Sequence, residues 1–463
     1  MTIDFSKIVN ERKEEILKTL SELIKIRSVY DETTITKETP FGKGINDALE
    51  YMLSTAKSDG FEIAQDGGYA GHIKYGNGDK IIGILCHLDV VPEGKGWTYP
   101  PYSATIVDNK MFSRGTTDDK GPTIASYYAL KLIKDAGIKL KNQIRIILGT
   151  DEETGWRGVK HYFENYPMPD AGFAPDCSFP LVYGEKGRIA IDLKAKNNNC
   201  CEIQTDILYS LKGGERYNVV IEEAVATTKK DLSVEFNKYL IENNLIGDVT
   251  LEKDIYTYIL KGKAAHAMEP FKGVNAATHL CNFFKDYSHH PIVQYVSKYH
   301  HNDHYLENLG LDYDDYEMGP ITCNVGIIDI DKEHSRLALD LRYPVRYDVE
   351  NFEQKIKKTY LENNLEIYNY THKTPHYISP ESSLVKLLYQ AYVKNTNDTV
   401  NKPFTVGGGT YASMLGNGVA FGSGMPGEEE LAHQVDEYMN LDSFFKSILI
   451  YIDAILLLGE VDA

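Results

Sequence analysis

The sequence has few cysteines, no long apolar run and no excess of positive charge. Its six cysteines include no CxxC pair, which excludes a disulfide-stapled mini-protein and favours a reduced, cytoplasmic protein. The most apolar stretch, residues 448–458, is too short to cross a bilayer and contains Asp453. Because residues 1–20 carry acidic side chains and no continuous apolar segment, we expect no secretory signal.

The overall charge limits the partners that the chain can bind. Asp and Glu number 67 against 49 Lys and Arg, a formal net charge of -18, so the chain repels nucleic-acid phosphate and anionic lipid. We therefore expect neither a nucleic acid nor a membrane as a partner. Hydrophobic residues make up 42% and charged residues 25% of the 463 positions, which is typical of a folded globular protein of about two or three domains.

Two short apolar segments end at side chains that can carry chemistry. Residues 81–86 and 144–148 have the composition of strands buried on both faces, and a helix is expected between them over 121–136. The first strand runs into His87 and the second into the acidic segment 151–153. Since the carboxyl ends of parallel strands meet at one edge of a sheet, this pattern predicts an α/β fold with a site at that edge.

After residue 187 the pattern of apolar and polar residues changes. Residues 189–195 alternate as in a half-exposed strand, and a polar stretch rich in Lys, Asn and Glu follows. Strand and helix patterns continue through 187–373, which predicts a separate, inserted α+β domain. We expect the first domain, residues 1–186, to resume at 374–463 and to end in an apolar helix capped near Asp442.

Three local clusters contain side chains suited to metal chemistry. His87 and Asp89 point to the same face of an extended segment, so the carboxylate could hold the imidazole tautomer that a metal ligand needs. Asp118 and Asp119 are adjacent, and either could bridge two cations. Within 151–153, neighbouring residues project in opposite directions, so one glutamate can bind metal while the other serves as a general base.

Each cluster also has a structural interpretation. Taken alone, the histidine could be an ordinary core or surface residue, the paired aspartates a helix N-cap, and the acidic segment a solvated turn. Asp176 and His433 are weak candidates by themselves. Together, the mixed imidazole and carboxylate donors favour zinc, manganese or cobalt over magnesium or calcium. Two such ions can activate a shared water for hydrolysis.

Five ordered motifs carry a resemblance to a known family. They are HLDVVP at 87–92, GTTDDKGP at 115–122, GTDEETG at 149–155, PDCSFP at 175–180 and AHQVDEY at 432–438. They resemble the M20 metallopeptidases, and most closely the PepV-like (Xaa-His, carnosinase-like) dipeptidase branch, over nearly the whole chain. The resemblance implies a phosphorylase/hydrolase-like α/β catalytic domain with a mixed sheet, plus an inserted α+β lid domain.

The resemblance also implies a two-metal site. Two divalent ions, Zn2+ or Mn2+ with Co2+ as a further option, would be held by five side chains: His87, Asp118, Glu153, Asp176 and His433. By similarity Asp118 is the bridge between the ion on His87 and Asp176 and the ion on Glu153 and His433. Asp89 would orient His87, Glu152 would be the catalytic general base and acid, and the Asp118–Asp119 peptide bond would be cis.

Further contacts with substrate are implied outside the metal site. By similarity His266 would stabilise the tetrahedral oxyanion, Asn218 would assist it, and Arg342 would hold the substrate's C-terminal carboxylate with its planar fork. From the residues alone, a surface histidine, a turn asparagine and a structural salt bridge are the alternatives. Gly408 and Gly409 lie in a turn that lacks the Lys-Ser/Thr of a Walker motif, and in relatives this loop lines the substrate site.

The implied function is metal-dependent hydrolysis of the peptide bond of dipeptides by an exopeptidase, with a metal-bridged water and Glu152 as the general base. Many relatives dimerise through a smaller lid, whereas the enlarged lid here implies a monomer in which His266 acts in cis. An M20 amidohydrolase that deacylates or desuccinylates amino acids is the nearest alternative. A catalytically silent scaffold that binds metal or peptide is less favoured, because Asp89 and Glu152 are intact.

Two expectations concern residues outside these roles. Cys86 stands where many relatives have glycine, and a thiol beside a metal ligand predicts activity that is sensitive to oxidation. The histidines of the inserted segment, including His279, His290 and His300, are expected to be solvated surface residues.

Overall fold

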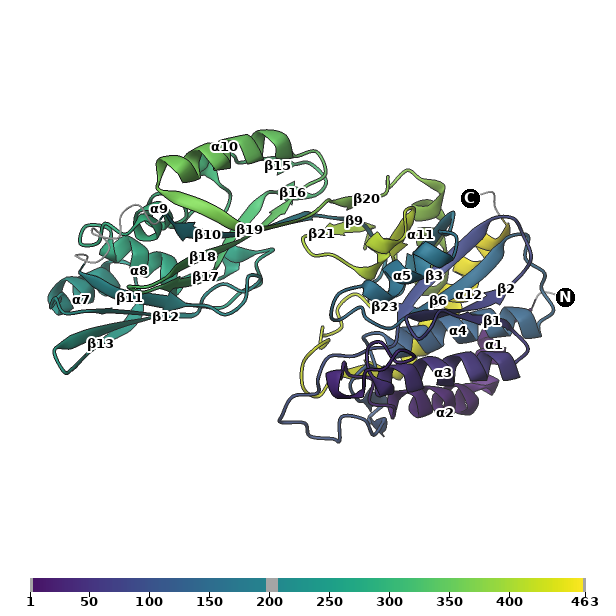
Figure 1. Ribbon diagram of the computed structural model, residues 1–463. Helices are drawn as coiled ribbons and strands as arrows, with labels where there is room; N and C mark the ends of the chain where they lie inside the picture. Colours follow the sequence, from purple (N-terminus) through teal and green to yellow (C-terminus); the bar gives the residue numbers. More distant parts are fainter. Residues whose placement is uncertain (1–2, 197–206, 461–463) are drawn as a thin grey trace. The chain divides into compact units, whose positions relative to one another are not determined.

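The computed structural model describes residues 3–196 and 207–460 (Figure 1). The described chain divides into two compact units. Unit 1 contains the residues up to Gly184, Tyr377–Phe404 and the residues from Thr410, whereas unit 2 contains Glu185–His376 and Thr405–Gly409. The glycine-rich segment, expected with the first domain, therefore groups with the inserted one. In the described residues, no helix is long and apolar enough to cross a membrane.

Unit 1 is built on a mixed sheet. The strand order is β1 (Glu62–Gln65), β2 (Ala70–Tyr75), β6 (Gln143–Gly149), β3 (Ile81–His87), β7 (Ala171–Ala174), β22 (Gly418–Ala420), β9 (Val182–Glu185) and β20 (His376–Tyr377), with β21 (Phe404–Val406) beside β9. Strands β6, β3, β7 and β22 run parallel, whereas β1, β2 and β9 pair antiparallel with their neighbours. Every residue of β3 and β6 is buried, as their continuous apolar sequence predicts.

Helices surround this sheet. They are α1 (Phe5–Glu11), α2 (Lys13–Ile24), α3 (Lys43–Ser58), α4 (Lys120–Asp135), α5 (Arg157–Asn165), α11 (Ser383–Thr396) and α12 (Leu441–Glu460). Figure 1 shows α12, from the end of the chain, beside α4. Because α4 also contacts β3 and α2, it is buried from Lys120 to Ile133. The helix that follows the histidine strand is thus part of the core.

Short strands complete unit 1 near the candidate site. Strands β4 (Thr105–Val107), β5 (Lys110–Phe112) and β24 (Tyr438–Asn440) form a three-stranded sheet, and β8 (Cys177–Ser178) pairs with β23 (Ser423–Gly424). The cap of α12 differs from the sequence expectation. The side-chain oxygen of Asn440 accepts the backbone N–H groups of Asp442 (2.9 Å) and Ser443 (3.3 Å), so the cap is Asn440 rather than Asp442.

Unit 2 is an antiparallel sheet with helices. Its strand order is β13 (Ile246–Glu252), β14 (Ile255–Lys261), β12 (Glu223–Thr228), β11 (Leu208–Gly213), β17 (Thr322–Ile330), β18 (Ser335–Tyr343), β10 (Gly187–Ala195) and β19 (Leu365–Lys373). Its helices are α7 (Ser233–Glu242), α8 (Ala276–Phe284), α9 (Pro291–Tyr299) and α10 (Val349–Glu362), and β15 (Asp314–Asp315) pairs with β16 (Gly319–Pro320). The polar stretch 197–206 lies outside the described residues.

Two sequence expectations for unit 2 are wrong. Strand β10 is mostly buried rather than half-exposed, because it pairs on both sides, with β18 and β19, and α9 packs against it. The expectation of surface histidines is wrong for His279, His290 and His300, which are buried, whereas His289 is exposed as expected. The three buried histidines belong to α8, to the N-cap of α9 and to the C-cap of α9, which pack on the sheet.

Candidate metal centre

The first candidate ligand lies where two parallel strands end. His87 is the last residue of β3 and is paired in register with Gly149, the last residue of β6. Gly149 must be glycine because a Cβ there would collide with the side chain of Tyr411. The acidic segment that starts at Asp151 follows directly. The parallel register therefore brings the imidazole and the acidic segment to one sheet edge.

The neighbouring aspartates before α4 have different surroundings. The turn is tight, since a Cβ on Gly121 would collide with the backbone oxygen of Thr116, and the Asp118–Asp119 peptide bond is cis. Asp119 is buried and its Oδ2 accepts the backbone N–H of His87 (3.0 Å). Asp118 instead presents both carboxylate oxygens to imidazole rings. The geometry favours Asp118 as a bridging ligand and Asp119 as a structural residue.

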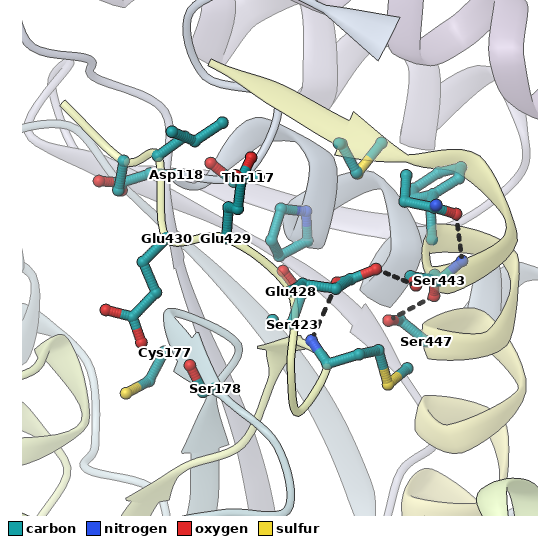
Figure 2. Close-up of a pocket in the computed structure, with 18 of the residues that line it drawn as sticks. Thr117, Asp118, Cys177, Ser178, Ser423, Glu428, Glu429, Glu430, Ser443 and Ser447 are labelled. Carbon is teal, nitrogen blue, oxygen red and sulfur yellow. Dashed lines mark hydrogen bonds between the residues drawn. The ribbon is translucent and has the colours of Figure 1, made fainter. Parts of the chain in front are cut away.

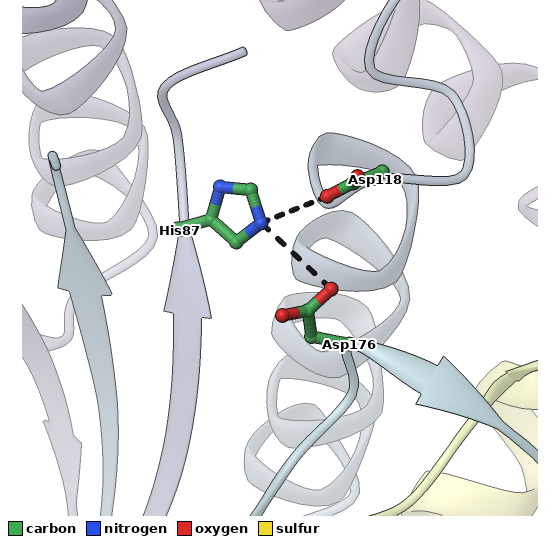
Figure 3. Close-up of side chains that lie close together, drawn as sticks. All are labelled: His87, Asp118 and Asp176. Atoms are coloured by element: carbon green, nitrogen blue, oxygen red, sulfur yellow. Dashed lines mark hydrogen bonds and ion pairs between the residues drawn. The ribbon is translucent and has the colours of Figure 1, made fainter. Parts of the chain in front are cut away.

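The first triad contains His87, Asp118 and Asp176. Nε2 of His87 lies 2.9 Å from Oδ1 of Asp118 and 3.8 Å from Oδ1 of Asp176 (Figure 3). The other ring nitrogen, Nδ1, lies 3.0 Å from the backbone oxygen of Asp89 and 3.5 Å from its carboxylate. A proton on Nδ1, directed at the Asp89 oxygens, would leave Nε2 available to a metal.

The second triad contains Asp118, Glu153 and His433. Nε2 of His433 lies 3.0 Å from Oδ2 of Asp118 and 3.1 Å from Oε2 of Glu153. His433 has a left-handed backbone with φ of 66°, and 54% of its side chain is exposed. The two triads therefore share Asp118, one carboxylate oxygen facing each histidine.

Asp89 has a wider role than the sequence suggests. Besides facing His87, its carboxylate accepts the backbone N–H groups of Glu152 (3.1 Å) and Glu153 (3.0 Å). One carboxylate thus fixes both the imidazole and the backbone of the two glutamates. The side chain of Glu152 is separate from the triads, and its Oε1 accepts a hydrogen bond from Nε1 of Trp156 (2.9 Å).

The charges of the site fit divalent cations. In residues 3–196 and 207–460, no lysine or arginine pairs with Asp118, Glu153 or Asp176; their ionic partners are histidines. Burial, followed by the negative charge of Asp176, raises the pKa of Glu152. Burial likewise raises the pKa of Asp176, with Asp118 adding to the effect. Converging carboxylates and imidazoles without a protein cation are a donor set suited to transition-metal ions.

Two residues that hold the site loops were missed in the sequence. Glu437, within the last motif, accepts hydrogen bonds from the backbone N–H of Thr117 (2.9 Å) and from Nη1 of Arg114 (2.7 Å). Both members of the Arg114–Glu437 pair are buried. This pair ties the turn before Asp118 to the loop of His433. The motif AHQVDEY contains Glu437, but nothing local indicates its distant partner.

The predicted substrate contacts lie in unit 2, where several of them are neighbours. The backbone of Asn218 binds Ala267, next to His266, with Ala267 N–H donating to the Asn218 oxygen (3.0 Å). Arg342 donates through Nη1 to the Gly407 oxygen (3.4 Å), which places it beside Gly408 and Gly409. Burial and the charge of Arg342 lower the pKa of His266.

The Arg342 fork is already engaged in part. Its Nε donates to Oδ1 of Asp340 (2.7 Å), and Arg188 pairs with the other oxygen of the same carboxylate (2.6 Å). Asp340 is completely buried. Two arginines against one aspartate leave one positive charge in excess. Arg342 can therefore form a structural salt bridge with Asp340 and also bind an anion.

The thiol of Cys86 is less exposed than its position in sequence suggests. Cys86 lies inside β3 and is completely buried. Burial raises the pKa of its thiol, which keeps it in the unreactive neutral form. The structure therefore argues against the expected sensitivity of this thiol to oxidation.

A cavity of about 400 Å³ adjoins the first triad within unit 1. Asp118 and Asp176 contribute to its wall, together with the segment 423–432. Glu428 is fixed by Ser443, whose hydroxyl donates to it (2.5 Å). Figure 2 shows Glu430 directed toward Cys177 and Ser178. The site thus has an adjoining space with acidic groups on its wall.

Comparisons with known proteins agree with this arrangement. The family model described as "Peptidase family M20/M25/M40" matches residues 83–457. A protein of Staphylococcus haemolyticus named "Putative dipeptidase" is 37% identical over 458 residues, covering 96% of this chain and 97% of the relative. One of the same name from Staphylococcus saprophyticus is 37% identical over 460 residues, with 96% and 97% covered.

Solved structures share the fold. An M20 family metallo-carboxypeptidase of Sulfolobus solfataricus matches with a TM-score of 0.58 and 18% identity, over 96% of this chain and 99% of that one. Human carnosine dipeptidase 1 matches with a TM-score of 0.58 and 14% identity, over 98% of each chain. With the family model and the relatives at 37% identity, these findings establish that the chain belongs to peptidase family M20/M25/M40.

Proposed function

We propose that this chain is a di-metal dipeptidase, which hydrolyses the peptide bond of small peptides. The observation that carries the proposal is the pair of triads that share Asp118, with Glu152 beside them and outside both. The names of the relatives at 37% identity support the choice of dipeptides.

The metal ligands follow from the two triads. His87, Asp118 and Asp176 would hold one ion, and Asp118, Glu153 and His433 the other. The donor set suits zinc or manganese, with cobalt able to replace them. When bound, such ions polarise a carbonyl and lower the pKa of water.

Glu152 serves as the general base and then the general acid. It accepts a proton from the attacking water and returns it to the leaving amine. Asp89 holds the Glu152 backbone through the hydrogen bond at 3.1 Å and orients His87. The acid–base group is therefore kept apart from the ligands although its sequence neighbour is one of them.

Unit 2 supplies the contacts to the rest of the substrate. His266 donates to the oxyanion of the tetrahedral intermediate, and Asn218 assists it. Arg342 binds the free C-terminal carboxylate, which the excess positive charge beside Asp340 supports. Gly408 and Gly409 line the same subsite, and a Cβ on Gly408 would meet no protein atom within 4 Å.

The cavity in unit 1 suits the other end of the dipeptide. It has room for an amino-acid side chain, and Glu430 on its wall offers a negative charge to a free α-ammonium group. An acylated amino acid lacks that positive charge. This feature favours a dipeptidase over a deacylase or desuccinylase of the same family.

Three further assignments are the branch of the family, the oligomeric state and the cellular compartment. The order of motifs and the large inserted unit support the PepV-like branch, which implies a monomer with His266 acting in cis. Cys86, Cys281 and Cys323 are free thiols, which supports a reducing, cytoplasmic environment. Light scattering at micromolar concentration tests the monomer.

The decisive experiment is hydrolysis of a dipeptide panel by the full chain after chelation and return of zinc, manganese or cobalt. We expect cleavage only with metal, and a kcat about 10²- to 10⁴-fold lower for Glu152→Ala. Glu164→Ala, an identical change at an exposed position of α5, is the matched control and should keep full activity.

The other functions give different outcomes. Cleavage of N-acetylated amino acids without cleavage of the matching dipeptides would assign the deacylase. Metal binding without hydrolysis of either class would leave a silent scaffold.

A further inference from the structure

We propose that Trp156 is a positioning residue that confines the proton carried by Glu152 to one carboxylate oxygen, Oε2. The inference rests on the proposed role of Glu152 as general base. It extends that role to a residue that belongs to neither triad.

The contact is specific to one oxygen of Glu152. The indole Nε1–H of Trp156 donates to Oε1 at 2.9 Å. In the described part of the chain, no donor reaches Oε2. A carboxylate on a flexible side chain would otherwise exchange its two oxygens by rotation. The indole therefore distinguishes two chemically identical atoms.

The backbone of Trp156 adopts an unusual conformation that makes this contact. Its φ of 59° lies in the left-handed region, which is disfavoured for a bulky residue and often marks a functional site. Asp151 holds the conformation. Its backbone oxygen accepts Trp156 N–H (2.7 Å), and its carboxylate accepts both the backbone N–H and Nε of Arg157 (2.8 Å each).

The indole ring also has a fixed support. Its centroid lies 5.9 Å from the ring of Tyr411, and that ring meets His87 edge-on at 6.0 Å. Tyr411 is completely buried, and its side chain lies against Gly149 at the end of β6. The indole that contacts Glu152 therefore packs beside a ring that is itself buried.

The chemistry of indole gives the consequence. Its N–H is a donor only and neither accepts nor releases a proton near neutral pH. When water attacks, one proton leaves the water for Glu152, and Oε1, which already accepts the indole hydrogen, is the less basic of its two oxygens. The proton therefore resides on Oε2. When the C–N bond breaks, its electron pair stays on the leaving nitrogen, which receives the same proton from the same oxygen.

Steady-state kinetics of the metal-loaded full chain test the positioning role. Trp156→Phe keeps a ring against Tyr411 but removes the donor. We expect kcat to fall about 10- to 100-fold, as for other residues that orient a catalytic group, with KM, metal content and melting temperature unchanged. The chain has only two tryptophans, so Trp97→Phe is the matched control. Nε1 of Trp97 donates to the Glu93 backbone, and this variant should keep full kcat.

Kinetic outcomes against the proposal are distinct. An unchanged kcat in Trp156→Phe would overturn it, and a raised KM with normal kcat would make Trp156 a substrate contact instead.

A spectroscopic measurement separates this proposal from the assigned function. In ¹⁵N-tryptophan-labelled Trp97→Phe protein, the single indole N–H signal reports on Trp156. We expect Glu152→Ala to move that signal upfield and to speed its exchange with solvent, even if no dipeptide is cleaved. An unmoved signal would refute the contact and leave the dipeptidase assignment intact. Absence of dipeptide hydrolysis with a moved signal would refute the dipeptidase assignment and leave the contact between Trp156 and Glu152 standing.

Discussion

The carboxylates of the candidate metal site in unit 1 and the buried aspartates of unit 2 are neutralised in different ways. In unit 1, Asp118, Glu153 and Asp176 converge with histidines as their ionic partners. In unit 2, Asp340 is paired with two arginines, Arg188 and Arg342. The second arrangement is complete within the protein, whereas the first leaves excess negative charge.

Other buried aspartates of unit 2 are also paired with arginines. Asp192 is paired with Arg336 (2.9 Å), and Asp315 with Arg346 (3.0 Å). A buried charge is costly unless an opposite charge lies beside it. The difference indicates that the site of Asp118, Glu153 and Asp176 is built to receive cations, whereas Asp192, Asp315 and Asp340 have their opposite charges within the protein.

The largest expected effect comes from Asp176→Asn. This change should lower the activity of the metal-loaded enzyme without lowering the stability of the chelated protein. In the loaded enzyme, kcat/KM should fall about 10²- to 10³-fold, because a metal ligand is lost and several kcal/mol of transition-state stabilisation depend on the metals. In the chelated protein, the melting temperature should hold or rise, since one repelling charge is removed. Activity assays and melting curves with and without chelator check both signs. A chelated variant that melts at a lower temperature than the chelated parent protein would contradict the comparison.

Asp340→Asn, in contrast, should destabilise unit 2 whether or not metal is present. Removing the shared partner leaves Arg342 buried without its carboxylate, so unit 2 should lose about 3 kcal/mol of unfolding free energy. Hydrogen exchange of peptides from β10 and β18 measures this locally. Asp248→Asn, on the exposed edge strand β13, is the control and should change stability by less than about 0.5 kcal/mol. Equal protection in the two variants would show that Asp340 is dispensable.

Arg342→Ala tests whether Arg342 binds the substrate or serves only as a structural partner of Asp340. If its fork holds the substrate carboxylate, KM for dipeptides should rise about 10- to 100-fold, the value of a charge-assisted hydrogen bond. Arg336→Ala also removes an arginine paired with an aspartate in unit 2. It should lower stability while leaving KM unchanged. A normal KM in Arg342→Ala would reduce this residue to a structural partner of Asp340.

Acid should weaken unit 2 through its buried histidines. Burial lowers the pKa of His300 to about 4, although Asp303 opposes the shift, and the ring otherwise faces Tyr295 and Cys323. Because the folded pKa lies below the ordinary value near 6.5, the unfolded chain binds the extra proton between pH 6.5 and about 4. Stability is thus lost as pH falls through that window.

Urea unfolding of unit 2, followed by hydrogen exchange at pH 7.5 and 5, measures this loss. For His300 we expect about 2 kcal/mol between these two pH values. His300→Gln should flatten the pH dependence, and His289→Gln, at an exposed position, should leave it as it is. A slope unaffected by His300→Gln would assign the acid sensitivity to other groups.

Much of the site could be predicted from the sequence because its ligands follow strand ends. The apolar runs before His87 and Asp151 both form parallel strands, β3 and β6. Local sequence left Asp118 and Asp119 equivalent, and only their surroundings separate them. Glu437 and Trp156 carried no comparable signal, because their roles depend on Arg114 and on a left-handed backbone.

The sequence by itself determined the family, many of the strands and helices, and which side chains are candidates for binding metal, because these depend on local composition and on ordered motifs. Only the tertiary structure decided which carboxylates are paired with arginines and which keep an uncompensated negative charge. The two arginines on Asp340 come from β10 and β18, which are far apart in sequence and adjacent in register. Burial and pairing depend on such long-range neighbours, so a pattern of single residues cannot reveal them.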